Sequence, residues 1–219
     1  MTAIKIEDVI YRYPRAKQNV IQNLTCSFEY GKFYVIAGSS GSGKTTILSL
    51  LAGIYQPLSG TIFYENEDIR KMDGAIYRRD CVSTIYQKLN LIPYLTASEN
   101  IELCLDLKGF QGDKQRYIAD LLQKVQLDSS LKDRYPAKLS GGECQRVAIA
   151  RCLASDSKVI LADEPTGNLD ADNANAIVKL FQNIAHEQNK CVIMVSHDIS
   201  IMDSVDELFR MKDGNFISK

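Results

Sequence analysis

The feature that most restricts how this chain can fold is a glycine-rich segment between two apolar ones. Residues 38–45 read GSSGSGKT and fit the pattern G-x-x-x-x-G-K-[ST]. The mostly apolar run before them, residues 32–37, reads as a strand, and the run after them, residues 45–53, suits a buried helix ending at Gly53. A strand, a glycine-rich loop and a helix in this order let backbone N–H groups and a helix N-terminus surround phosphate oxygens. The segment therefore predicts an α/β fold that binds a nucleoside triphosphate.

Two side chains at the end of this loop have chemistry that suits the phosphates. Lys44 is expected to reach the β- and γ-phosphates, and Thr45 to offer its hydroxyl to Mg²⁺, which keeps most of its waters and needs few protein oxygens. The residues expected to contact the nucleotide here are Ser39, Ser40, Gly41, Ser42, Gly43, Lys44, Thr45 and Thr46. The pattern alone leaves kinases, GTPases and motor proteins open.

Two adjacent carboxylates end a second apolar run. Residues 158–163 read KVILAD, and Glu164 follows Asp163 directly. This arrangement suits one acid that holds Mg²⁺, through a water, and one that polarises an attacking water. On that interpretation Asp163 is the metal-side residue and Glu164 the general base, and the alternative is two acids that merely end a buried strand in solvent.

The rest of the chain reads as a single unit built around a parallel sheet. Residues 158–163 and 191–196 are continuous apolar runs with a helical stretch between them, as strands buried on both faces require. Residues 96–155 read as largely helical, and the Asp213-Gly214 pair between apolar runs predicts a hairpin near the end. The sequence contains no internal repeat or interdomain linker.

Charge and composition exclude several classes of partner. The 219 residues include 26 basic and 27 acidic side chains, so no overall field draws the chain to nucleic acid or to anionic lipid. No apolar run approaches the roughly 20 residues that span a bilayer, and the charged N-terminus lacks the features of a secretory signal. The six cysteines form no C-x-x-C pair. We expect a cytosolic protein with reduced, structural thiols and no membrane span of its own.

Three further motifs narrow the class. Residues 139–143 read LSGGE, residues 164–170 read EPTGNLD, and residues 196–198 read SHD. With the loop and the paired acids, they stand in the order and at the spacing of the ABC ATPase family, which the chain resembles over essentially its whole length. The resemblance implies that Ser140, Gly141 and Gly142 form the family signature at a helix N-terminus, where small residues let the signature contact the ATP held by a second protomer.

Other roles follow from the resemblance residue by residue. Gln87 resembles the glutamine that senses Mg²⁺ and the attacking water where a transmembrane partner docks, and His197 the histidine that contacts the γ-phosphate. Asp170 resembles the aspartate that links the two sites of a dimer. The implied catalytic residues are Glu164, His197, Lys44 and Gln87, and the implied metal-side residues are Thr45, Gln87 and Asp163.

Two positions are less well defined. Tyr13 is the candidate for stacking on adenine, with Tyr11 as its rival, and either could instead pack in the antiparallel lobe. Cys144 departs from the family pattern, which usually has glutamine near the end of the signature, and a thiol cannot donate the hydrogen bonds of an amide.

The resemblance implies an α/β fold of the P-loop NTPase (RecA-like) type with a parallel sheet, an antiparallel β subdomain and an inserted helical subdomain. Residues 1–219 would form one ABC ATPase domain, with the core and antiparallel lobe at approximately 1–90 and 156–219 and the helical subdomain at approximately 91–155. The implied ligands are ATP and Mg²⁺. The implied partners are a second copy of the chain and a transmembrane permease, which would hold it at the inner face of the cell membrane.

The motif ADEPTGNLD, the short length and the lack of a C-terminal extension resemble the branch of macrolide-export, lipoprotein-release and antimicrobial-peptide-export ATPases. The resemblance favours export or extraction of a peptide-like or amphipathic substrate. A membrane regulator that moves no solute, in signalling or cell-wall remodelling, is the alternative. A DNA-repair ATPase is disfavoured because no long heptad segment interrupts the chain, and a module that binds ATP without turnover is disfavoured by Glu164 and His197.

Overall fold

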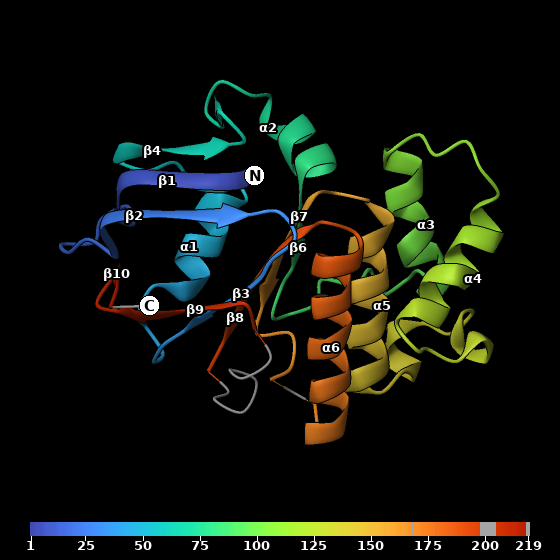
Figure 1. Ribbon diagram of the computed structural model, residues 1–219. Helices are drawn as coiled ribbons and strands as arrows, with labels where there is room; N and C mark the ends of the chain where they lie inside the picture. The colour runs from blue at the N-terminus through green and yellow to red at the C-terminus, as the bar shows by residue number, and fades with distance from the viewer. Residues whose placement is uncertain (168, 198–204, 218–219) are drawn as a thin grey trace.

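The computed structural model describes residues 1–167, 169–197 and 205–217 and contains two β-sheets with helices between and beside them (Figure 1). Asn168 and Asp198, which belong to two of the motifs above, lie outside the described residues. Among the helices within the described ranges, none combines the length and the apolar character that a bilayer crossing requires.

The N-terminal sheet is antiparallel. Its strands lie in the order β2-β1-β4-β5, with bounds β1 Thr2–Tyr11, β2 Ile21–Glu29, β4 Ser59–Tyr64 and β5 Glu67–Asp68. Apolar side chains alternate along β1, so that Ile4 and Ile6 are buried while Lys5 between them is exposed. One face of this sheet therefore covers the core.

The second sheet has the order β10-β9-β3-β8-β7-β6. Its strands are β3 Phe33–Ala37, β6 Val82–Ile85, β7 Val159–Asp163, β8 Cys191–Ser196, β9 Glu207–Lys212 and β10 Asn215–Phe216. All its pairings are parallel except that of β9 with β10, the hairpin predicted at Asp213-Gly214, where both residues have positive φ (47° and 78°). The predicted strands at 158–163 and 191–196 are confirmed as β7 and β8.

The helices are distributed around these sheets. They are α1 Lys44–Leu51, α2 Gly74–Ile76, α3 Ala97–Leu107, α4 Lys114–Lys124, α5 Gly141–Ala154 and α6 Ala171–Glu187, with short turns η1 Tyr77–Cys81, η2 Ser129–Leu131 and η3 Pro136–Lys138. In Figure 1, α1 lies between the two sheets, and α3, α4, α5 and α6 gather on the far side of the parallel sheet.

Two apolar clusters explain this layering. One joins the antiparallel sheet, α1 and the face of the parallel sheet that carries Tyr34 and Ile36, and the other joins the opposite face, which carries Phe33 and Val35, to α3, α4, α5 and α6. Every residue of β3, β7 and β8 is buried because apolar layers cover both faces. The predicted fold class, a parallel-sheet core with an antiparallel sheet and helices, is confirmed.

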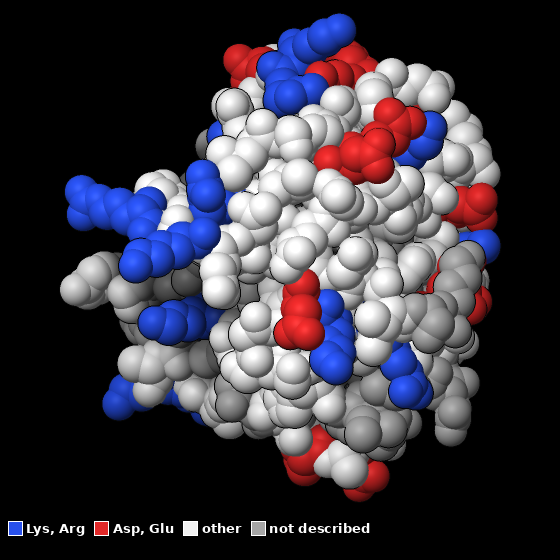
Figure 2. All heavy atoms as spheres, turned by 90° about the vertical axis from the view of Figure 1, so that its left-hand side faces the viewer, with Lys and Arg blue, Asp and Glu red and all other residues white. Residues whose placement is uncertain are grey.

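The left-hand side of the molecule in Figure 1 faces the viewer in Figure 2, and uncharged residues make up most of what is seen there. Figure 2 shows basic side chains gathered along one edge of this face and acidic ones scattered over the rest. No continuous band of positive charge crosses the part of the surface seen in that view.

Gly60 allows β4 to approach β1 closely. Its φ is +80°, and a Cβ there would lie 2.4 Å from the carbonyl oxygens of both Glu7 and Asp8. We predict that Gly60→Ala lowers the free energy of unfolding by roughly 2–4 kcal/mol, because it adds a backbone clash to the strain of a left-handed residue. Gly109→Ala is the matched control and should lose only about 1 kcal/mol, since Gly109 has φ +65° but no atom within the described part of the chain lies less than 4 Å from its Cβ position. Urea titration measures both, and equal losses would contradict the explanation.

Candidate functional site

The loop between β3 and α1 borders a pocket of ≈ 420 Å³. The residues that line it are Tyr13, Val20, Ser40, Gly41, Gly43, Lys44, Thr45, Thr46, Gln87 and Glu164. A second cavity of ≈ 460 Å³ on the other side of the loop is lined by Gly38, Ser39 and His197, among others, but by neither Lys44 nor Glu164. The first pocket is therefore the candidate site.

Local backbone geometry brings the loop around the lysine. Gly41 and Gly43 have φ of 80° and 108°, which an L side chain adopts only under strain, and α1 begins at Lys44. The buried Lys44 Nζ donates hydrogen bonds to the carbonyl oxygens of Gly38 (2.8 Å) and Ser39 (2.9 Å). The ammonium group thus lies across the loop, where phosphate oxygens entering the pocket would compete for it.

A hydroxyl and a carboxylate form a suitable place for a cation. Thr45 Oγ1 donates to Asp163 Oδ1 at 3.3 Å, and Asp163 is only 7% exposed. Burial raises the pKa of Asp163, an effect that the hydrogen bond from Thr45 partly opposes. A cation beside the carboxylate would offset this desolvation, and two hard oxygen donors next to phosphates are the ligands that Mg²⁺ prefers. These residues therefore fit Mg²⁺.

Glu164 is the centre of a contact among three strand ends. Its Oε2 accepts a hydrogen bond from Gln87 Nε2 (3.1 Å), and its Oε1 lies 3.1 Å from His197 Nδ1. Glu164 follows β7, Gln87 follows β6 and His197 follows β8, and these strands are neighbours in the sheet. The structure thus brings Glu164 together with Gln87, which lies 77 positions before it, and with His197, which lies 33 positions after it.

Three tyrosines pack together, and one of them, Tyr13, borders the pocket. Tyr13 lines the pocket, and its hydroxyl is hydrogen-bonded to Thr46 Oγ1 at 2.8 Å. Tyr11 is 5% exposed and stacks on Tyr55, with ring centroids 5.3 Å apart, while Tyr13 meets both rings edge-on. Of the two candidates for adenine stacking, the accessible ring at the pocket is that of Tyr13.

Several predicted residues do not face this pocket. Ser39 borders the other cavity, Ser42 is buried, and the exposed Ser140, Gly141 and Asp170 lie at the N-termini of α5 and α6. Ser140 and Glu143 form a capping box, and Asp170 caps α6 by accepting from Asn173 N (2.9 Å). A Cβ on Gly142 would lie 3.3 Å from Leu169 Cδ2, so the signature packs against the segment leading to Asp170.

The carboxylates of these caps are stabilised as anions. A backbone hydrogen bond from Asn173 lowers the pKa of Asp170, and one from Ser140 lowers that of Glu143. Burial raises the pKa of Cys144, whose thiol donates to the Pro136 carbonyl at 3.5 Å. Cys144 therefore binds η3 as a neutral thiol.

Val20 is a lining residue that the sequence did not reveal. It joins the pocket because β2 returns beside the glycine-rich loop, where a Cβ on Gly43 would lie 3.1 Å from the Val20 carbonyl. No motif surrounds it, so only the chain path could identify it.

The pocket places the glycine-rich loop and Lys44, which suit phosphates, beside the carboxylate of Glu164, as expected of a phosphate-loop nucleotide hydrolase. The family model of ABC transporters matches residues 21–167. YclH, an ABC transporter ATP-binding protein of Bacillus subtilis, is 41% identical to this chain over 220 residues. The match covers 100% of this chain and 97% of YclH. LolD of Blochmanniella floridana, the ATP-binding protein of a lipoprotein-releasing system, is 36% identical over 207 residues. That match covers 93% of this chain and 88% of LolD. The chain belongs to the ATP-binding proteins of the ABC transporter family.

Solved structures agree with this assignment. The dimeric cassette MJ0796 of Methanocaldococcus jannaschii superposes with a TM-score of 0.91 at 33% identity, covering 98% of this chain and 97% of its own. The same cassette is known in a post-hydrolysis state bound to ADP and phosphate. The chain is thus an ATPase, the motor subunit of a transporter, in the branch that includes the lipoprotein-release ATPases, and the predicted family, activity and cofactors, ATP with Mg²⁺, are confirmed.

We predict that Tyr13→Ala weakens ATP binding by about ten- to a hundredfold, because stacking a base on an aromatic ring contributes about 1–3 kcal/mol. Tyr13→Phe keeps the ring and loses only the hydrogen bond to Thr46, so its dissociation constant should change less than about fivefold. Calorimetric titration with ATP measures both. An equal loss in the two variants would mean that the hydroxyl, and not the ring, is what matters.

Proposed function

We propose that two copies of this chain enclose each ATP between the pocket of one copy and the signature residues 140–142 of the other. The observation that carries the proposal is that the signature lies apart from the pocket. Glu164, Gln87 and Lys44 line the pocket. Ser140 and Gly141 are exposed and lie outside it. An exposed helix N-terminus with two glycines is suited to meet phosphate oxygens that come from elsewhere. The dimeric state of MJ0796 supports the same arrangement.

In this arrangement Glu164 is the general base. It accepts a proton from the attacking water, while Gln87 and His197 orient its carboxylate through the two contacts of 3.1 Å. Lys44 leaves the carbonyls of Gly38 and Ser39 and binds the β- and γ-phosphates. Mg²⁺, held by Thr45 and Asp163, would neutralise phosphate charge.

We further propose that closure and opening of the dimer act on a separate permease. The segment after β6 presents Tyr94, 86% exposed, with Tyr86 and Ile92 also exposed. Aromatic residues on an open surface are favoured at protein interfaces. On this proposal residues 91–155 form the helical subdomain within the one domain 1–219, and docking on the permease keeps the chain at the cytoplasmic face of the membrane.

For the cargo, the likeness to LolD supports export or extraction of a lipid-linked, peptide-like or otherwise amphipathic substrate. The motor carries no cargo pocket in this scheme, and selection belongs to the permease. A permease without a substrate cavity would instead favour a membrane regulator.

We predict that Glu164→Gln lowers kcat for ATP by at least about a hundredfold, since general-base catalysis contributes about 10²–10⁴. The variant should still bind ATP and should become dimeric with it, because the amide keeps the shape of the carboxylate. Turnover of the native chain should rise more than linearly with protein concentration. Light scattering and a phosphate-release assay measure these quantities, and linear turnover that survives the substitution would refute the two-copy site.

We also predict that a photo-crosslinking amino acid at Tyr94 couples the chain to an integral membrane protein in membranes of its own cell. The same amino acid at Leu58, which is 58% exposed beside β4, is the control for surface accessibility and should give no such product. Crosslinks of equal yield from both positions, or from neither, would contradict docking at this face.

A further inference from the structure

The loop that carries Gln87 has an unfavourable backbone conformation. Leu89 and Asn90 have φ of 40° and 49°, in the left-handed region that residues with a Cβ avoid. Asparagine tolerates this region because its side chain can hydrogen-bond locally, but the apolar side chain of leucine cannot, and the Leu89 N–H donates only to the Tyr86 carbonyl (2.9 Å). Consecutive residues of this kind persist only where their surroundings hold them, so something must fix the loop between Gln87 and Ile92.

Arg151 of α5 provides that restraint. Its guanidinium donates from Nη2 to the Leu89 carbonyl (2.6 Å) and from Nη1 to the Asn90 carbonyl (2.7 Å). The planar fork of an arginine fixes two acceptors at once, which a lysine ammonium on a flexible stem does not. The two carbonyls held in this way belong to the two residues with positive φ.

The burial and the hydrogen-bond partners of Arg151 indicate that its role is to hold the loop and not to form an ion pair. The side chain is partly buried, and burial lowers the pKa of its guanidinium. Among the described residues no carboxylate forms an ion pair with Arg151, and its guanidinium donates to the two carbonyls instead. A cation removed from water without a counter-ion is expensive to keep, and an apolar residue would fill the space more cheaply.

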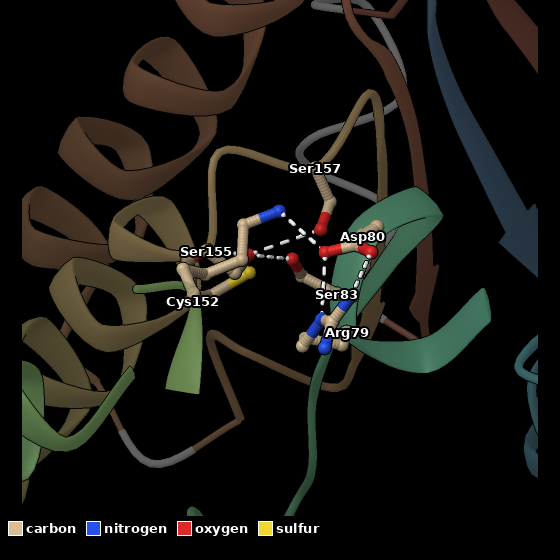
Figure 3. Close-up of polar contacts among 7 residues, drawn as sticks. Arg79, Asp80, Ser83, Cys152, Ser155 and Ser157 are labelled. Carbon is tan, nitrogen blue, oxygen red and sulfur yellow. Dashed lines mark hydrogen bonds and ion pairs between the residues drawn. The ribbon is translucent and has the colours of Figure 1, made fainter. Parts of the chain in front are cut away.

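The same helix is also joined to the strand before the loop. Ser155, the C-cap of α5, shares a hydrogen bond with Ser83 of β6, and Figure 3 shows these hydroxyls pointing toward each other with Ser157 beside them. Asp80, just before β6, forms an ion pair with Lys108 at the end of α3 (3.1 Å). The helices α3 and α5 are thus both attached to the β6 segment that precedes the loop.

From these contacts we propose that Arg151 is a positioning residue that locks the Gln87 loop to the signature helix. Ser140 and Arg151 are 11 residues apart on α5, or about 16 Å along the helix axis, so a rigid helix joins them. One end of α5 would meet the ATP of the second copy, and the other fixes the loop from which Gln87 reaches Glu164. Each copy then senses the closure of one ATP site and adjusts the base of the other.

The inference rests on the proposed two-copy function for its consequence, but the lock itself can be tested without turnover. In Arg151→Lys the amide hydrogens of residues 88–91 should exchange with solvent at least about tenfold faster, because two carbonyl contacts are reduced to one. Arg146→Lys is the matched control. Arg146 also lies on α5 and also holds a carbonyl, that of Val125 at 2.6 Å, but away from this loop. Unchanged exchange in Arg151→Lys, or equal acceleration in Arg146→Lys, would overturn the lock.

Turnover tests the positioning role through a double-mutant cycle. Arg151→Lys should lower kcat about tenfold and change KM for ATP less than about twofold, because the phosphate loop is untouched. In a Gln87→Ala background the same substitution should change kcat less than about twofold, since its effect passes through Gln87. Arg146→Lys should have the same effect in both backgrounds.

If the loss in kcat of the double variant equals the product of the losses in Arg151→Lys and Gln87→Ala, the two residues act independently. That result would show that Arg151 only stabilises the fold and would overturn the positioning role. All assays are run well below the lowest melting temperature of the variants. If Arg151→Lys does not fold, Arg151→Gln replaces it, because a neutral amide leaves no lone ammonium in the half-buried site. A native chain without Glu164-dependent turnover would refute the proposed function alone, since the exchange measurement stands independently.

Discussion

The parallel pairing of the central strands determines the position of almost every group at the nucleotide pocket. Ala37 pairs with Ser196, Asp163 with Val195 and Ile85 with Ala162, so the loops after β3, β8, β7 and β6 leave the sheet at one level. A backbone hydrogen bond from Glu164 N to the Val195 carbonyl (3.0 Å) extends this pairing past the end of β7. Because these strands are buried on both faces, a shift in register would expose apolar residues and separate the carboxylate from its neighbours.

The sequence predicts well what depends on neighbouring residues. The strand, loop and helix around Lys44 follow from apolar runs and glycine, and the structure differs from that expectation by no more than two residues at any boundary. The contact of Gln87, Glu164 and His197 depends on the strand order β8-β7-β6, which no local pattern carries. Only the resemblance to a family suggested that these three belong together, and their roles remain predictions.

What the sequence missed depends on chain path or on backbone conformation. Val20 reaches the pocket because β2 returns to it, and Arg151 matters because Leu89 and Asn90 adopt positive φ. Neither signal is readable in a single sequence: an arginine in the last turn of a helix is ordinary, and Leu-Asn is not a typical left-handed turn. For Cys144 the sequence identified a departure, and the contact with the Pro136 carbonyl shows that a thiol can still tie the signature helix to η3.

The signature helix has to provide hydrogen-bond acceptors for the backbone donors at its N-terminus and still leave this end accessible to a second copy of the chain. Ser140 and Glu143 satisfy two of its backbone donors reciprocally, those of Glu143 and Ser140, and this keeps the carboxylate folded back against the cap. Gly141 and Gly142 lie between them without side chains, and no atom of the described residues lies within 4 Å of where a Cβ of Gly141 would be. Their N–H groups belong to the first turn, which no intrahelical carbonyl can satisfy. In the proposed dimer the capping box therefore stabilises α5 in the single copy, while the donors at the two glycines remain for the phosphates that a partner brings.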